Sequence, residues 1–405
     1  MKNGFPHLLP AFVAILTLFG LLAGGSLYAR SLELRYVNAL APARPRQANI
    51  GSALQEAALL QPDLLPVYGS SEMFFEKDEN SAAQFFQNYP TGFTVFEVAV
   101  GGITSLEIAQ NLAALGPELK GKKVIVSFTP HMFIKPQIGQ TAYAGDFSRL
   151  HANEMVFDSS ISFKLKQRTA SRMLDYPDSL VNDPLLNFAL QNLASRSPFH
   201  RLMYYLSMPV GWVQTQVIRL QDHWAVLNWI HSHAQTLRLV PRKTYSIDWN
   251  AEIDRARILQ NELTSSNPYG IENSTWDGTG QQIPGREVAP GSSNNYFSQE
   301  VAHSKEWDDL DILLSVLKET GARPLILSRP LNGVMWNVRG VSSAARRAFY
   351  KRLQEAVQPY GFPLVDFSDQ DTNRLFSTDF LSHTSRLEWV YIDQTLDAFY
   401  HGKIH

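Results

Sequence analysis

The chain of 405 residues contains no cysteine. This absence excludes disulfide bonds, thiolate nucleophiles and thiolate metal sites, and it is compatible with an oxidising compartment. The sequence also lacks GxGxxG and Walker-type phosphate loops and any ligand spacing typical of a zinc site. Its 36 basic and 38 acidic residues leave a net charge of -2. That balance gives no electrostatic reason to expect a nucleic-acid partner.

One long segment without charge lies near the N-terminus. Residues 8–29 form a run of 22 uncharged residues. As a helix this run would be roughly 33 Å long, which matches a bilayer core of roughly 30 Å. A cleaved signal peptide is the alternative, but the bulky Leu27 makes "LYA" a poor cleavage site. We expect an uncleaved membrane anchor over residues 1–30, with residues 8–29 in the membrane, followed by a Pro- and Arg-rich linker over 31–52.

The remainder, residues 53–405, has the pattern of one α/β domain. Five apolar runs each end in a turn signal, and helical stretches such as 105–115 and 343–360 separate them. Near-continuous apolar strands alternating with helices indicate a three-layer domain with a parallel sheet covered on both faces. In such sheets, ligands bind beyond the carboxyl ends of the strands. The five runs are 63–71, 93–102, 122–130, 322–333 and 361–368.

The middle of the chain departs from this alternation. Residues from about 144 to 300 carry amphipathic segments and predict a largely helical insertion. Within it, residues 274–295 are rich in glycine, proline and serine, which is typical of a long exposed loop. Long loops of this kind often serve as lids or binding surfaces.

Three side chains are candidates for nucleophilic catalysis, which needs an activated hydroxyl, a base and a group that orients the base. Ser71 follows the first apolar run and precedes a helical stretch, so its hydroxyl would lie at the sheet edge. Serine at this place is equally a helix cap. His383 is the candidate base, and Asp379, four residues earlier, could receive its imidazole N–H. The alternative interpretation of this pair is a surface loop with a helix cap.

Four further residues lie where strands are predicted to end. Gly101 and Gly102 permit close backbone approach, so an N–H there could face an oxyanion, although a tight turn is the simpler interpretation. Asn332 could position substrate, and Asn-Gly is also a turn signal. His131 could donate to an oxyanion or line the pocket, but a lone histidine is more often structural.

Two other groups of residues carry weaker signals. His231 and His233 form an H-x-H pair, but residues two apart do not share a helix face, so we expect no metal there. The aromatic residues Trp212, Trp224 and Trp229 indicate helix packing or a membrane-proximal surface rather than a cofactor site.

Taken in order, these motifs resemble the D-alanine transfer protein (DltD) family within the SGNH/GDSL-type hydrolase superfamily. The resemblance covers nearly the whole chain. It rests on "GSSEM" (69–73), "VGGITSLEIAQNLAAL" (100–115), "SFTPHMF" (127–133), "SSNPYGIEN" (265–273), the stretches 304–336 and 361–369, and "HTSRLEWVYID" (383–393). The resemblance implies that Ser71 is the nucleophile, His383 the base and Asp379 the orienting acid.

The sequence departs from the family pattern in three places. The family usually spaces acid and histidine as D-x-x-H, whereas Phe380 occupies that position here and Asp379 lies one residue further back. The third-strand motif usually reads Ser-Pro-Gln-Trp-Phe, and residues 129–133 read Thr-Pro-His-Met-Phe instead. The glycines that usually follow the histidine are replaced by residues 385–388. We expect these changes to reshape the pocket.

The resemblance also implies a function. We expect a single-pass membrane-anchored serine acyltransferase or esterase whose soluble domain lies on the extracellular or periplasmic side. It would take part in D-alanylation of a teichoic-acid-like polymer without a cofactor. The implied partners are a membrane-bound O-acyltransferase of the DltB kind, a D-alanyl donor and the polymer acceptor. Two alternatives stay open: an O-acyl esterase acting on an envelope glycan, and a non-catalytic polymer-binding scaffold for the acyltransferase.

Overall fold

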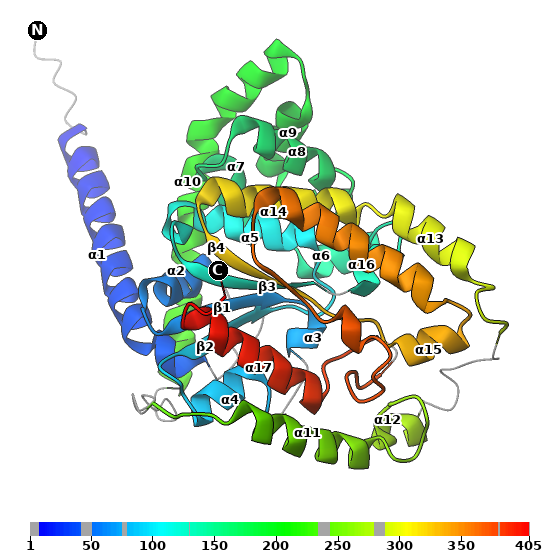
Figure 1. Ribbon diagram of the computed structural model, residues 1–405. Coiled ribbons are helices and arrows are strands. Elements are labelled where there is room, and N and C mark those ends of the chain that lie inside the picture. The colour runs from blue at the N-terminus through cyan, green and yellow to red at the C-terminus, as the bar shows by residue number, and fades with distance from the viewer. Residues whose placement is uncertain are drawn as a thin grey trace, which may run out of the picture.

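The five apolar runs form one parallel sheet. The computed structural model describes residues 8–41, 51–74, 79–128, 130–233, 244–278, 288–379 and 381–404. Its strands lie in the order β2-β1-β3-β4-β5, and every neighbouring pair is parallel (Figure 1). The predicted α/β class with a parallel sheet is therefore confirmed. The strands are β1 (Leu64–Gly69), β2 (Thr94–Ala99), β3 (Lys123–Phe128), β4 (Arg323–Ser328) and β5 (Leu364–Asp366).

The central strands are buried on both faces, which explains their continuous apolar sequences. Successive side chains of a strand point to opposite faces of the sheet. Val124 and Val126 of β3 accordingly belong to one core, whereas Ile125 belongs to the other, together with Leu325 and Leu327 of β4. A strand with two buried faces cannot alternate polar and apolar residues, so its hydrophobic run is unbroken.

Helices cover both faces of the sheet and complete three layers (Figure 1). The first core packs under α2 (Ser52–Leu60), α5 (Ser105–Leu115), α14 (Glu306–Thr320) and α16 (Ser343–Val357). The second core packs under α3 (Ser71–Phe74), α4 (Ala82–Asn88), α11 (Trp249–Leu263) and α17 (Arg386–Tyr400). Because all strands are parallel, their carboxyl ends meet at one edge, where β1 ends at Gly69.

Between β3 and β4 the described residues contain helices and no strand. The helices α7 to α10 form a lobe that projects from the body (Figure 1). The predicted long loop 274–295 begins inside α12, and its residues 279–287 lie outside the described ranges. Apart from α11 and α14, the helices of this region are α6 (Gln140–Asp146), α7 (Arg149–Phe157), α8 (Phe163–Met173), α9 (Pro184–Ala194), α10 (Pro198–His233), α12 (Asn273–Gly278) and α13 (Asn294–His303).

Short elements complete the fold. Helix α15 (Gly333–Val338) follows β4 and precedes α16. Within the described ranges, short 3₁₀ helices connect longer elements: η3 (Gly116–Leu119), η4 (Pro130–Ile134), η5 (Pro177–Leu180), η7 (Gln358–Tyr360) and η8 (Ser368–Gln370).

The N-terminal helix α1 (Leu8–Leu40) packs its C-terminal part against the body. Val37 and Leu40 join the first core, and the Glu33 carboxylate lies 2.7 Å from Nδ1 of His223 on α10. The first ten residues of the predicted 31–52 linker are therefore helical, whereas residues 42–50 lie outside the described ranges. Among the described residues, no helix combines the length and apolar character needed to cross a membrane, so the span predicted over 8–29 is not confirmed.

Candidate active site

Ser71 lies where the central strand β1 passes into a helix. The strand ends at Gly69, Ser70 follows, and Ser71 is the first residue of α3. Glycine is required at position 69 because a Cβ there would lie 2.5 Å from Cγ of Met73. The tight turn leaves Ser71 half-buried at the carboxyl edge of the sheet, whereas the Ser70 side chain is buried.

The Ser71 hydroxyl meets an imidazole from the other end of the chain. Its Oγ lies 3.1 Å from Nε2 of His383, and Nδ1 of His383 lies 2.6 Å from Oδ2 of Asp379. With Nδ1 protonated toward the carboxylate, Nε2 is an acceptor for the serine O–H. The structure thus brings together the three side chains that the sequence singled out, in the arrangement of a hydrogen-bonded nucleophile, base and orienting acid.

The D-x-x-x-H spacing is accommodated by a tight loop. Oδ1 of Asp379 accepts the backbone N–H groups of Leu381 at 2.9 Å and His383 at 3.2 Å. Ser382 has a φ of 60° and absorbs the extra residue in the left-handed region. Burial alone would raise the pKa of Asp379, but the hydrogen bonds and charge of His383 and the backbone donors lower it overall. The acid is therefore held as a carboxylate.

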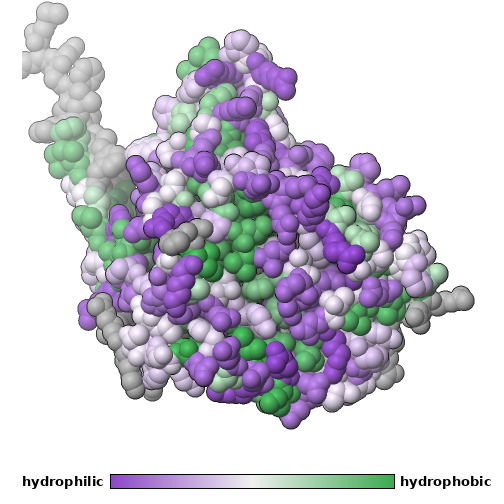
Figure 2. Space-filling model, in the orientation of Figure 1, coloured by the Kyte–Doolittle hydropathy of each residue, from purple (hydrophilic) through white to green (hydrophobic). Residues whose placement is uncertain are grey.

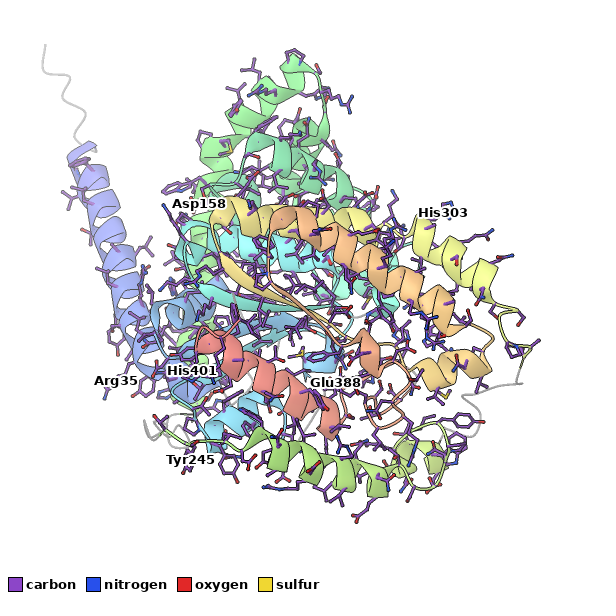
Figure 3. The ribbon with its side chains drawn as sticks, viewed as in Figure 1. Arg35, Asp158, Tyr245, His303, Glu388 and His401 are labelled. Atoms are coloured by element: carbon purple, nitrogen blue, oxygen red, sulfur yellow. The ribbon has the colours of Figure 1, made fainter. Side chains whose placement is uncertain are left out.

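A buried ion pair between Arg329 and Glu388 is hydrogen-bonded to this loop. The Arg329 guanidinium donates to the Glu388 carboxylate, with 2.7 Å between Nε and Oε1, and to the Ser382 carbonyl at 2.9 Å. The two charged side chains are 1% and 0% exposed. Figure 3 shows Glu388 near the N-terminal end of α17. Burial raises the pKa of Glu388, and the neighbouring Arg329 opposes that shift.

Sequence reasoning missed this pair, although one signal was present. Arg329 is a charge inside the apolar run "PLILSRPL", and such a residue is rarely buried without a partner. Sequence reasoning also did not single out Thr384. Its hydroxyl donates to the Glu72 carbonyl and so connects the loop that carries His383 to α3. These contacts fix the position of His383 relative to Ser71.

Asn332 forms hydrogen bonds with the loop that carries Asp379 and His383. Its backbone N–H donates to the Ser382 hydroxyl at 2.9 Å, and its Nδ2 donates to the Asp379 carbonyl at 3.2 Å. Its Oδ1 accepts the Met335 N–H and caps α15. With 4% of its surface exposed, Asn332 holds the loop in place, and its predicted contact with substrate stays a prediction.

The two glycines after β2 lie beside the serine pair. A Cβ at Gly101 would lie 3.9 Å from the Ser71 Cβ, so this turn passes directly against the nucleophile candidate. Gly102 has a φ of 89°, which favours glycine, and its N–H donates to the Ser70 hydroxyl at 3.0 Å. Because Ser70 already accepts that N–H, Ser70 would have to rotate before Gly102 could serve an oxyanion. The oxyanion role stays a prediction.

His131 lies in η4, at the carboxyl end of β3. Its ring is half-buried and its centroid lies 5.9 Å from that of Trp336 on α15. Its role toward an oxyanion or substrate also stays a prediction. Within the described ranges, no group of three His, Asp or Glu side chains could hold a metal ion.

Comparison with known proteins adds a second line of evidence. A family model described as "DltD protein" matches residues 43–401. The chain is 26% identical over 355 residues to Protein DltD of Bacillus subtilis (strain 168), with 87% of each chain covered. It is 25% identical over 353 residues to Protein DltD of Staphylococcus aureus (strain NCTC 8325 / PS 47), covering 87% of this chain and 85% of the other. Since the match spans the sheet, the helical lobe and the serine–histidine site alike, the chain belongs to the DltD family.

Proposed function

We propose that this protein is a serine acyltransferase of the SGNH type that takes part in D-alanylation of a teichoic-acid-like polymer. The observation that carries the proposal is the continuous hydrogen-bonded line from Ser71 through His383 to Asp379. Membership of the DltD family supports the D-alanyl group as the acyl unit and a cell-surface polymer as the acceptor. The position at the carboxyl edge of a parallel sheet is where such folds bind ligands.

In the proposed first half-reaction, the Ser71 oxygen attacks the D-alanyl carbonyl of the donor while Nε2 of His383 takes the hydroxyl proton. The resulting tetrahedral oxyanion collapses, the bond to the donor's leaving group breaks, and His383 returns the proton to that group. The product is a D-alanyl ester on Ser71. General base assistance of this kind contributes about 10²–10⁴-fold, and oxyanion donors add a comparable or larger factor.

In the second half-reaction, a polymer hydroxyl attacks the same carbonyl and gives its proton to His383. The ester bond to Ser71 breaks, and the proton passes to the serine oxygen. Throughout both steps, the Asp379 carboxylate orients the imidazole and stabilises its protonated form. If water takes the place of the polymer hydroxyl, the same residues perform ester hydrolysis, so the acceptor alone separates transferase from esterase.

A fluorophosphonate probe tests the nucleophile directly, because it modifies activated serines. We expect labelling of the purified full chain, loss of labelling in Ser71→Ala and retained labelling in Ser70→Ala. In cells that lack the protein, wild type should restore surface D-alanine esters and Ser71→Ala should not. Equal rescue by both, with no labelling of the folded wild type, would instead fit the non-catalytic scaffold.

We further propose that the chain is held at the outer face of the cell membrane through residues 8–29, where it meets a membrane-bound O-acyltransferase. The supporting observation is a groove of about 560 Å³ between α1, α2 and α10, lined by apolar side chains such as Leu22, Leu27 and Trp212 and, in addition, by charged ones such as Arg30 and Glu33. Figure 2 shows hydrophobic side chains exposed on α1 and on the projecting lobe. Trp212 and Trp224 are both exposed, which fits the membrane-proximal surface predicted for them.

Membrane fractionation tests this location. The full chain should sediment with membranes and resist extraction by high salt, and a chain that begins at residue 31 should be released. Recovery of that shortened chain in the membrane fraction would show that attachment does not depend on residues 8–29.

A further inference from the structure

Helix α10 carries an exposed apolar stripe along one side. Large apolar side chains recur there at intervals of three, four or seven residues and therefore share one face of the helix. Each of them is between 51% and 65% exposed. Single exposed apolar side chains are normal, whereas a contiguous row of them marks an interaction surface. This α10 stripe consists of Phe199, Leu202, Leu206, Val210, Val213, Val217 and Trp224.

The opposite face of α10 is buried against the rest of the lobe. The Tyr204 hydroxyl donates to the Val156 carbonyl at 2.8 Å, and a Cβ at Gly211 would lie 2.2 Å from the ring of Phe157 on α7. Helix α10 is thus apolar on the face that meets the core and on the face that does not. A helix that is apolar all round is typical of a protein core or of a lipid environment.

The charges around the α10 stripe fit a lipid surface. Residues 198–221 contain no Asp or Glu. The first acidic residue of α10, Asp222, accepts the Ala53 backbone N–H at 2.9 Å. The exposed Arg201 lies beside the stripe, with its guanidinium carbon 5.8 Å from the ring centroid of Tyr205. Basic side chains and amphipathic aromatic rings next to an apolar face are typical of helices at the membrane interface.

The α10 stripe continues into the groove between α1, α2 and α10. Leu22 and Leu27 of α1 line this groove together with Val213 and Val217 of α10. In Figure 1, α1 and the lobe that carries α10 extend from the body toward the same side. Since Leu22 and Leu27 belong to the segment proposed to lie in the membrane, this part of the α10 stripe lies at the level where the bilayer begins.

The two helices are fixed relative to each other. Helix α1 runs without interruption from Leu8 to Leu40, and its C-terminal part joins the first core through Val37 and Leu40. Glu33 adds a contact to α10, with 2.7 Å between its Oε1 and Nδ1 of His223. The depth of α1 in a membrane therefore sets the depth of α10 as well.

We infer that the α10 stripe lies against the lipid acyl chains of the outer leaflet and forms a second membrane contact beside α1. The inference rests on the proposed attachment through residues 8–29 and extends it to the helical lobe. A single contact would let the body rotate about α1, whereas two contacts fix the direction in which the Ser71 edge of the sheet points. An interfacial apolar face binds reversibly compared with a spanning helix. This agrees with the expected release of a chain that begins at residue 31.

Quenching by brominated lipid tests the contact. The chain has no cysteine, so a fluorescent bimane group can be attached to one introduced cysteine at a time. The full chain with Leu206→Cys or Val213→Cys is placed in vesicles of phosphatidylcholine and phosphatidylglycerol, with or without bromine on the acyl chains. An interfacial helix buries its apolar face roughly 5–10 Å into the lipid, so emission at both positions should fall by about twofold with bromine.

Ile258→Cys on α11 is the matched control. Ile258 is also a large apolar side chain, 62% exposed, and α11 lies on the side of the body away from the lobe (Figure 1). Its emission should be the same in both lipids. Leu16→Cys on α1 reports the proposed anchor itself and should be quenched. All four side chains are exposed, and substitutions at such positions usually change stability little.

Emission that bromine leaves unchanged at either Leu206 or Val213 would overturn the inference, as would equal quenching at Ile258. If Leu16 were still quenched, the attachment through residues 8–29 would stand, and a protein partner would be the better candidate to cover the α10 stripe. Quenching at Leu206 and Val213 but not at Leu16 would support the stripe and remove the anchor. Fluorophosphonate labelling of Ser71 does not depend on these outcomes, so the catalytic proposal is tested separately.

Discussion

Arg329 and Glu388 form a fully buried ion pair beneath the loop that carries Asp379 and His383. The pair joins the end of β4 to the start of α17, and Arg329 also donates to the Ser382 carbonyl within the loop. Since Ser382 has a positive φ, the loop is in a conformation that non-glycine residues seldom adopt. The ion pair and Asn332 together hold it there, so the geometry of the proposed catalytic site depends on residues outside the Ser71–His383–Asp379 line.

Removing one member of this pair should destabilise the protein. Glu388→Gln leaves the Arg329 charge buried without its partner, which costs about 3–5 kcal/mol. The free energy of unfolding, measured by urea denaturation, checks this. The exposed pair Lys351–Glu355 is the control, and Glu355→Gln should change stability by less than about 1 kcal/mol. The double variant Arg329→Met/Glu388→Met should be more stable than either single variant, because no unpaired charge remains. If Glu388→Gln left the free energy of unfolding unchanged, the prediction would be contradicted.

Asp379→Asn should slow acylation while the fold is retained. An asparagine can donate to the ring and so favours the tautomer in which Nε2 carries the proton and cannot accept it from Ser71. We expect the rate of fluorophosphonate labelling to fall by about 10²–10⁴-fold. The exposed Asp369 in η8 provides the control, since Asp369→Asn changes the same group away from the site. Equal labelling rates in the two variants would show that Asp379 does not orient the base.

Thr384→Val should affect the rate of labelling more than stability. Its hydroxyl donates to the Glu72 carbonyl and links the histidine loop to the helix that begins with Ser71. Valine has a similar shape but cannot donate, so the fold should lose only about 1 kcal/mol. Labelling should slow by about tenfold or more, because small displacements of a catalytic group are costly. Thr395→Val, which removes a comparable bond to the Tyr391 carbonyl inside α17, should leave the rate unchanged.

The raised pKa of Glu154, a residue outside the candidate site, predicts that the stability of the protein depends on pH. Burial raises its pKa from the ordinary value of 4.5 to about 7, despite the opposing Arg219. A carboxyl with a raised pKa in the folded state binds its proton more tightly there, so stability is lost as pH rises from about 4.5 to about 7. Glu154→Gln mimics the protonated form and should show a smaller loss between pH 5 and pH 8 in urea denaturation. Parallel pH profiles for both proteins would contradict this assignment.

Local sequence patterns were sufficient for the strands and several helices. The five apolar runs contain β1 to β5, and the predicted helical stretch 105–115 is α5. The stretch predicted over 343–360 comprises α16 (Ser343–Val357) followed by the 3₁₀ helix η7 (Gln358–Tyr360). Buried strands and capped amphipathic helices are specified by residues close together in the chain, so their pattern is visible without tertiary structure. The start of α5 shows this, because Thr104 and Glu107 form a capping box within one turn.

Some features of the candidate site could likewise be predicted from local sequence, whereas others could not. That Ser71 begins a helix just after a strand follows from its neighbours in sequence, and the resemblance to a known family singled out His383 and Asp379. The partner of Arg329 could not be predicted in this way, because a charge within an apolar run indicates burial but does not identify the residue that it contacts. Glu388 lies 59 residues from Arg329. Periodicity reports which face of an element is buried, whereas contacts between distant segments, including the meeting of Ser71 with His383, exist only once the chain has packed.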